Sequence, residues 1–157
     1  MEPLSPIRYE SGRPMLLGGV RQWHPFSAEG SGIPEQWRQF ESLGQIPGQL
    51  GANAYGVMCG HNAEGFEYMC AVEVNNFDEL PGQLGRMRLK AQDYAVFEHR
   101  GPVSTIRETW EGIFDWLANS ASDQSAHKPD FEVYGETFDP STGLGGAEIW
   151  ISVVRKA

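Results

Sequence analysis

Cysteine is scarce in this chain, and the shortage excludes two kinds of small protein. Only Cys59 and Cys70 occur among its 157 residues. Two cysteines are too few for a disulfide-stapled scaffold, and two buried free thiols are favoured over a disulfide. Cys59, His61 and Cys70 are also too sparse for a zinc site, which needs about four closely spaced ligands. The sequence therefore predicts neither a metal nor any other cofactor.

Positive charge is also in short supply. The 12 Lys and Arg residues are outnumbered by 21 Asp and Glu residues, which gives a net charge of −9. A nucleic-acid-binding protein needs a basic face to replace the counterions on phosphates, so we expect no direct contact with nucleic acid. An acidic protein instead raises the local concentration of cations and of basic partners.

Long apolar runs are the third absence. No stretch approaches the roughly 20 residues that a membrane-spanning helix needs. Glu2, Pro3 and Arg8 near the start do not fit a signal peptide, so we expect no membrane association and a cytoplasmic location. With 40% hydrophobic residues, the sequence predicts a single domain, over residues 13–157. Residues 1–12 contain proline, serine and glycine and are expected to form a flexible lead-in.

The order strand–helix–strand–strand is predicted twice along the chain. The first set is expected at residues 14–24, from Pro34 onward, and at residues 55–59 and 66–74. The second set is expected at residues 94–99, after Thr105, and at residues 130–136 and 147–154. Thr105 and Glu108 have the spacing of a capping box at the start of the second helix.

The two predicted helices share a pattern of apolar positions. Ile33, Trp37 and Phe40 recur as Ile106, Trp110 and Ile113, each 73 residues later. We interpret this echo as two pseudo-repeat halves, at about residues 13–76 and 90–155. The expected fold class is α+β, with a mainly antiparallel sheet and a central ligand pocket, because interfaces between such halves favour pockets.

One carboxylate stands out among the aromatic residues of the second half. Glu132 lies inside a predicted strand, in the segment Phe131-Glu132-Val133-Tyr134. An ionised carboxylate in apolar surroundings is costly unless a positive or hydrogen-bonding group meets it. Such a strand either satisfies the carboxylate internally or holds it ready for a cation.

Four motifs stand out in this half, namely Phe97-x-His99-x-Gly101-Pro102, Thr109-Trp110, Phe131-Glu132-x-Tyr134 and Glu148-Ile149-Trp150-Ile151. Together they resemble the gyrase-inhibitor-like effector-binding domain. The resemblance covers about residues 15–154. It implies the duplicated strand–helix–strand–strand fold of the SHS2-type dyad and an aromatic pocket for amphipathic, often cationic, small molecules. The family's pocket glutamate falls on Glu132.

Two features depart from that family. Ser152 stands where the family usually has proline, which leaves the pocket inference intact. No helix-turn-helix precedes the predicted domain, although the related modules are fused to AraC- and MerR-type transcription regulators. The resemblance therefore implies a sensor domain and does not extend to transcriptional control.

The candidate ligand-binding residues follow from strand alternation and from the resemblance. Because side chains alternate along a strand, Glu132 and Tyr134 are expected on one sheet face, and Glu148 and Trp150 likewise share a face. The full predicted set is Glu132, Tyr134, Trp110, Tyr55, Glu148, Trp150 and Trp37. For Trp110 and Trp37 a purely structural place in the core is the alternative, and for Glu132 and Glu148 it is a solvent-exposed position on an edge strand. No catalytic residue is predicted, and His99 is expected to be structural.

Three functions remain open at this level. The leading one is a stand-alone binding module for cationic, amphipathic aromatic molecules. The first alternative is a hydrolase of strained electrophilic compounds that uses Glu132 as general base or acid. The second is a gyrase-interacting, inhibitor-like protein. A homodimer and a separate regulator are further partner alternatives.

Overall fold

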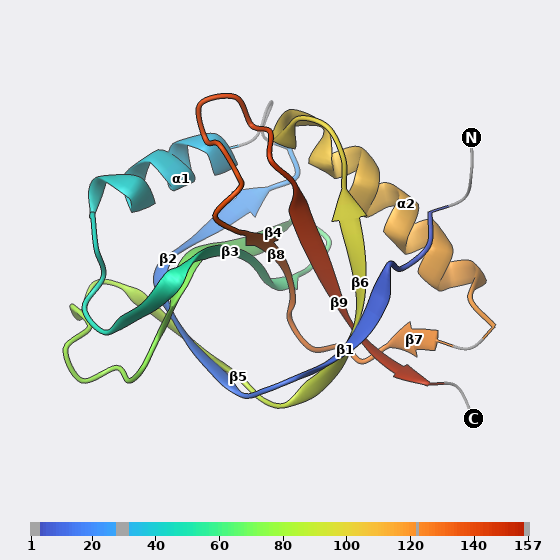
Figure 1. Cartoon of the computed structure of the whole chain (residues 1–157), viewed down its shortest axis with the longest axis horizontal. Helices are drawn as coiled ribbons and strands as arrows, with labels where there is room; N and C mark the ends of the chain where they lie inside the picture. The colour runs from blue at the N-terminus through green and yellow to red at the C-terminus, as the bar shows by residue number, and fades with distance from the viewer. Residues whose placement is uncertain (1–3, 28–31, 122, 156–157) are drawn as a thin grey trace. The chain divides into compact units, whose positions relative to one another are not determined.

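The computed structural model describes residues 4–27, 32–121 and 123–155, and the chain divides into two compact units (Figure 1). Unit 1 comprises Met1–Arg13 together with Ala91–Ala157, and unit 2 comprises Pro14–Lys90. Each unit combines antiparallel strands with one α-helix. Within the described ranges, neither helix is long and apolar enough to cross a membrane.

Unit 2 is a four-stranded antiparallel sheet with one helix against it. Its elements are β2 (Met15–Pro25), α1 (Ile33–Ser42), β3 (Gln49–His61), β4 (Gly65–Val74) and β5 (Gly85–Leu89). The strand order is β3-β4-β2-β5, and α1 contacts β2 and β4.

Unit 1 repeats this arrangement. Its elements are β1 (Arg8–Gly12), β6 (Gln92–His99), the 3-10 turn η1 (Val103–Thr105), α2 (Ile106–Asn119), β7 (Asp123–Ser125), β8 (Asp130–Tyr134) and β9 (Ala147–Arg155). The strand order is β8-β9-β6-β1, and β7 also pairs with β9.

The predicted duplication and the α+β class are confirmed by this topology. In each unit one strand, β4 or β9, lies between the strand before the helix and a strand after it. The helices α1 and α2 begin at Ile33 and Ile106, the two residues that open the 73-residue echo.

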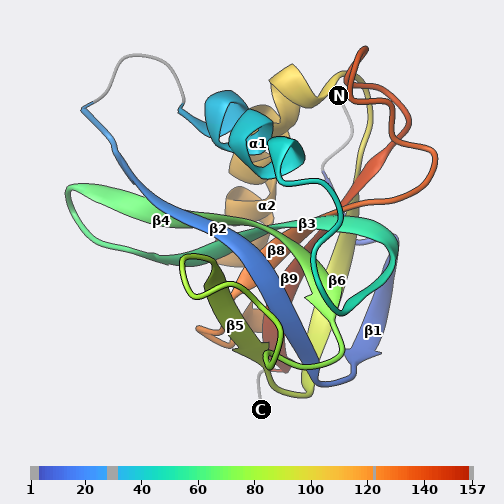
Figure 2. The same cartoon turned by 90° about the vertical axis from the view of Figure 1, so that its left-hand side faces the viewer.

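The outer strands are exchanged between the two halves of the sequence. β1 leads directly into β2 but pairs with β6, and β5 leads directly into β6 but pairs with β2 (Figure 2). The registers match as well, because Arg8 lies opposite Val96 and Gly85 lies opposite Gly19. Gly85 lies 77 positions after Arg8, and Gly19 lies 77 positions before Val96. The same shift therefore relates β1 to β5 and β6 to β2. Both halves therefore have five corresponding elements rather than four.

The prediction of a flexible lead-in over residues 1–12 is wrong for Arg8–Gly12, which form β1. The strand is short and mostly polar, and its partner residues on β6 lie 80 to 88 residues away in sequence, so no local pattern marks it. Charged side chains such as Arg8 and Glu10 are typical of edge strands, where they oppose pairing with other chains. β5 and β7 are likewise not among the predicted elements, because they have only five and three residues. Residues 1–3 lie outside the described part.

The capping-box prediction at the start of α2 is also wrong. Thr105 is the N-cap residue, but its side chain makes no capping hydrogen bond to the helix. Its hydroxyl instead donates to the carbonyl oxygen of Pro102, 2.8 Å away. The 3-10 turn that precedes the helix places this carbonyl within reach, so the hydroxyl closes the turn.

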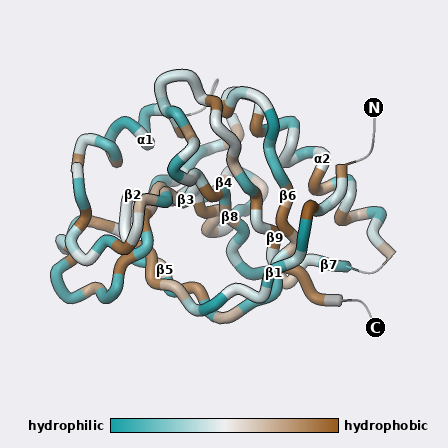
Figure 3. Tube along the Cα trace, viewed as in Figure 1, coloured by the Kyte–Doolittle hydropathy of each residue, from teal (hydrophilic) through white to brown (hydrophobic). Residues whose placement is uncertain are grey.

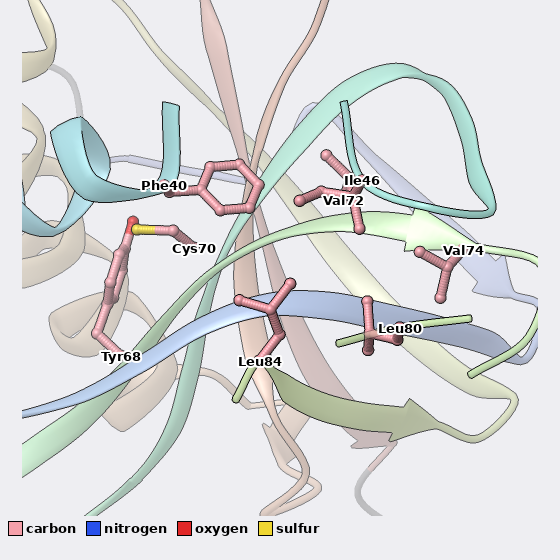
Figure 4. Close-up of a cluster of buried hydrophobic side chains, with 8 residues drawn as sticks. All are labelled: Phe40, Ile46, Tyr68, Cys70, Val72, Val74, Leu80 and Leu84. Carbon is pink, nitrogen blue, oxygen red and sulfur yellow. The ribbon is translucent and has the colours of Figure 1, made fainter. Parts of the chain in front are cut away.

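The core of unit 2 lies between α1 and its sheet. Figure 4 shows its buried members, which are Phe40, Ile46, Tyr68, Cys70, Val72, Val74, Leu80 and Leu84. The helix itself is mostly polar, as its teal colour in Figure 3 shows. It is attached through the fully buried Gln36, whose amide nitrogen donates to the carbonyl oxygens of Val20 and Tyr68.

Unit 1 has its most apolar strands at its centre. β6 and β9 carry brown stretches in Figure 3, and Val96, Phe97, Ile149 and Ile151 are all buried. Val96 and Phe97 point to opposite faces, so residues of both alternating sets are buried at the centre of this sheet.

Candidate functional site

Glu132 lies on β8, on the sheet face of unit 1 that is turned toward α2. It pairs with Ile149 of β9, and Ile149 in turn pairs with Phe97 of β6. Directly paired residues share a face, and the ring of Phe97 contacts Trp116 of α2. The Glu132 side chain is only 4% exposed. The carboxylate that the sequence sets among large apolar residues is therefore buried.

The two oxygen atoms of this carboxylate each accept a hydrogen bond from an aromatic side chain. The indole Nε1 of Trp110 donates to Oε2 at 2.8 Å, and the hydroxyl of Tyr134 donates to Oε1 at 2.8 Å. Both donors are neutral, so they stabilise the carboxylate without cancelling its charge. Both oxygen atoms of Glu132 are thus held by hydrogen bonds from aromatic side chains, one on α2 and one on β8.

Two further aromatic rings flank these donors and were missed from the sequence. Phe114 lies one turn beyond Trp110 on α2, and their ring centroids are 5.8 Å apart. Phe138 follows β8, and its ring centroid lies 4.8 Å from that of Tyr134. The spacing of four residues between Trp110 and Phe114 is a helical signal that could have revealed the first contact. No local pattern marks the second.

The loop between β8 and β9 is fixed where it carries Phe138. The carbonyl oxygen of Gly143 accepts a hydrogen bond from the backbone nitrogen of Val103 in η1, at 2.8 Å. Gly145 has φ of 110°, and a Cβ atom there would lie 1.8 Å from the carbonyl oxygen of Thr137. Only glycine fits such a position, which keeps the two sides of the loop in close contact.

Glu148 and Trp150 lie on the opposite face of the same sheet. Trp150 pairs with Phe131 and Glu148 pairs with Val133, the residues that alternate with Glu132 on β8. The structure therefore does not bring Glu148 and Trp150 together with Glu132. The guanidinium of Arg8 bonds Glu148 and holds the pKa of that carboxyl below its usual range.

The remaining two candidates belong to unit 2. Trp37 lies on α1 and makes edge contacts with the rings of Phe40 and Tyr68, which is the packing of a core residue. Tyr55 pairs with Ala71 on the sheet face turned away from α1, and it is 8% exposed. A role for either in ligand binding stays a prediction.

His99 has the structural place expected of it. It is 3% exposed, and its ring nitrogens lie 2.7 Å from the hydroxyl of Thr109 and 2.8 Å from the carbonyl oxygen of Pro102. Since a carbonyl only accepts, Nε2 carries the proton, and in the neutral ring Nδ1 accepts from Thr109. His99 thereby joins the end of β6 to the first turn of α2, which carries Trp110.

Asp130 begins β8, two residues before Glu132. Its Oδ1 accepts hydrogen bonds from the backbone nitrogen of Ser152 at 2.8 Å and from the Ser152 hydroxyl at 3.1 Å. Burial raises the pKa of Asp130 to about 6, although the bonds from Ser152 oppose the shift. Serine at position 152, where the resembling family has proline, thus supplies the backbone donor that anchors β8.

Asp130→Asn is expected to change how stability depends on pH. A carboxyl whose pKa is raised on folding binds more protons in the folded state, so the wild type loses stability as pH rises from about 4 to about 6. The asparagine keeps an oxygen for Ser152 but cannot ionise, so the variant should gain about 1–2 kcal/mol relative to wild type between these pH values. Urea unfolding at pH 4, 5, 6 and 7 measures this, with the exposed Asp115→Asn as control. An unchanged difference across the series would contradict the prediction.

Comparisons with known proteins identify the family to which this duplicated α+β fold belongs. Residues 19–153 match the family described as Cass2, integron-associated effector binding protein, and the chain belongs to this family. The resemblance to effector-binding domains seen in the sequence is thereby confirmed.

Individual relatives include a regulator and two solved structures. The transcriptional regulator BrlR of Pseudomonas aeruginosa is 30% identical over 118 residues, which are 71% of this chain but 42% of the regulator. The structure of SAV2435 bound to tetraphenylphosphonium has a TM-score of 0.73 at 19% identity and covers 94% of this chain and 93% of its own. An integron cassette protein of Vibrio cholerae has a TM-score of 0.70 at 16% identity, with 98% and 100% coverage. At such identities the two structures show the shared fold.

Proposed function

We propose that this protein binds cationic, amphipathic aromatic small molecules, with Glu132 as the charged group of the site. The observation that carries the proposal is the pair of hydrogen bonds from Trp110 and Tyr134 to a carboxylate that is only 4% exposed. A carboxylate buried in this way attracts a cation more strongly than one in water, because the effective dielectric constant is lower.

The aromatic rings supply the second part of the interaction. A cation over an aromatic face gains about 0.5–2 kcal/mol, and flat apolar groups of a ligand gain from contact with the same rings. Together with the charge attraction, this makes micromolar affinity, on the order of −8 kcal/mol, attainable. Selectivity should be broad, since neither contribution requires a particular pattern of hydrogen bonds.

A relative supports the same ligand class. SAV2435 was solved with tetraphenylphosphonium, a lipophilic aromatic cation, and shares the fold of this chain. We propose that the present protein acts as a small-molecule-binding module. Its net charge of −9 is in keeping with a cationic ligand and with no direct contact to nucleic acid.

The proposed preference for cationic ligands can be tested with two ligands of the same shape and opposite charge. Tetraphenylphosphonium and tetraphenylborate have similar size and four phenyl rings each but opposite charge. We expect calorimetric titration to give micromolar affinity for the cation and at least about a hundredfold weaker binding of the anion, because the carboxylate repels it. Equal affinities would contradict the proposal.

The hydrolase alternative is tested by mass spectrometry of a strained electrophilic ester after incubation with the protein. Turnover of the ester that Glu132→Gln abolishes would decide in favour of this alternative.

A further inference from the structure

A second carboxylate–aromatic pair lies on the other face of the unit 1 sheet. Glu148 and Trp150 are two residues apart on β9, and the indole Nε1 of Trp150 donates to Oε1 of Glu148 at 3.1 Å. The Trp150 ring stacks on Phe131, with centroids 5.5 Å apart and planes 22° apart, and it contacts Tyr94 at 5.5 Å. These contacts hold the indole beside the carboxylate.

The guanidinium of Arg8 occupies this pair. Its two terminal nitrogens lie 2.7 Å and 2.9 Å from the two oxygens of Glu148, and its carbon lies 5.7 Å from the centre of the Trp150 ring. The Nε atom of Arg8 lies 2.7 Å from a carboxylate oxygen of Glu10. A planar cation therefore already sits against an aromatic ring and in the fork of a carboxylate, as a bound ligand would.

The surroundings of Arg8 favour further positive charge. Glu98 of β6 lies directly opposite Glu148 of β9, and Glu10 lies on the same side of β1 as Arg8. Like charges directly opposite in a sheet repel each other, and Arg8 offsets this repulsion. Arg100 approaches Glu98 at 3.6 Å and is mostly exposed. Without Arg8, the face would present three carboxylates beside an indole.

We propose that Glu148 and Trp150 form a second binding site, for planar guanidinium or amidinium compounds, which the protein's own Arg8 fills until such a ligand replaces it. The class follows from the geometry, because only a planar group with two parallel N–H donors reproduces the fork of bonds to Glu148. The site is separate from Glu132, which lies on the opposite face of the sheet. It is thus independent of the function proposed for that residue.

Arg8 is placed so that it can be displaced. The side chains of Arg8 and Glu148 are 37% and 33% exposed, and partly exposed ion pairs contribute little net stability. Among the described residues, β1 pairs with β6 alone, and its five residues form one end of the strand order. Because Arg8 is tethered to the site, it competes as a ligand present at a high effective concentration. Removing it should therefore raise the affinity for an external guanidinium compound.

Phenylguanidine is the probe, and phenyltrimethylammonium, which has no N–H donor, is its comparison. We expect Arg8→Gln to bind phenylguanidine about fivefold more tightly than wild type, with a smaller gain for phenyltrimethylammonium. Adding Glu148→Gln to Arg8→Gln should remove the gain, whereas adding Glu132→Gln should leave it. Arg8→Lys keeps the charge but not the fork, so it should give an intermediate gain, and it serves in place of Arg8→Gln if that variant fails to fold. In wild type, saturating phenylguanidine should raise hydrogen exchange at residues 8–12.

Three results would overturn the proposal. The first is that neither Arg8→Gln nor Arg8→Lys binds phenylguanidine more tightly than wild type. The second is a gain that survives Glu148→Gln. The third is a gain that Glu132→Gln abolishes, which would place the probe at the other site. Failure of tetraphenylphosphonium to bind would contradict only the function proposed for Glu132, since that ligand cannot form the fork of hydrogen bonds.

Discussion

Glu132→Gln is expected to weaken the binding of tetraphenylphosphonium by about tenfold or more, a loss of roughly 1.4 kcal/mol or greater. Glutamine keeps the shape of the side chain and an oxygen that accepts from Trp110 or Tyr134, so the change isolates the charge. Affinity for a neutral aromatic ligand should barely change. Tryptophan fluorescence titration of both proteins with a matched ligand pair provides the measurement.

The control for this experiment is Glu136→Gln, at an exposed glutamate four residues further on. It removes the same charge from the protein but not from the buried site, so it separates a local effect from that of net charge. Equal losses for charged and neutral ligands in Glu132→Gln would indicate a steric or folding effect. No loss for either would place Glu132 outside the site.

The elements that the sequence predicts correctly are those with a strong local period. Ile33, Trp37 and Phe40 mark one face of α1, and the aromatic segment around Glu132 marks β8. Local patterns do not reveal β1 and β5, because each has only five residues and pairs with a strand that is distant in sequence. β1 pairs with the later strand β6, and β5 pairs with the earlier strand β2. Their pairing depends on tertiary structure, which local patterns do not contain.

The same distinction separates the predicted site residues. Strand alternation correctly places Glu132 with Tyr134, and Glu148 with Trp150. Which of the two pairs meets a helix and which meets Arg8 depends on strand order, and in that order β1 pairs with β6 across 80 to 88 residues of sequence. A sequence pattern therefore finds both carboxylates but does not show which one bonds Trp110 and Tyr134 and which one bonds Arg8.

The combined substitution of Trp110→Phe and Tyr134→Phe should affect stability more than ligand binding. Both phenylalanines keep an aromatic ring at each position, a smaller one at 110, but remove the two donors to Glu132. A buried carboxylate that loses hydrogen-bond donors loses solvation that water does not replace, so we expect the free energy of unfolding to fall by about 3–5 kcal/mol. Urea unfolding at pH 8 measures the loss.

The two donors also oppose the attraction between Glu132 and a cation, because their positive ends face the carboxylate. In the double variant a bound cation replaces part of the lost solvation, so affinity for tetraphenylphosphonium should be retained or should rise by about threefold. Adding Glu132→Leu to the double variant also removes the carboxylate that the two donors had stabilised. Most of the lost stability should then return, and the preference for the cation should disappear. A double variant as stable as wild type would show that the two aromatic donors do not stabilise the carboxylate. A triple variant that still preferred the cation to tetraphenylborate would show that the charge of Glu132 does not select the ligand.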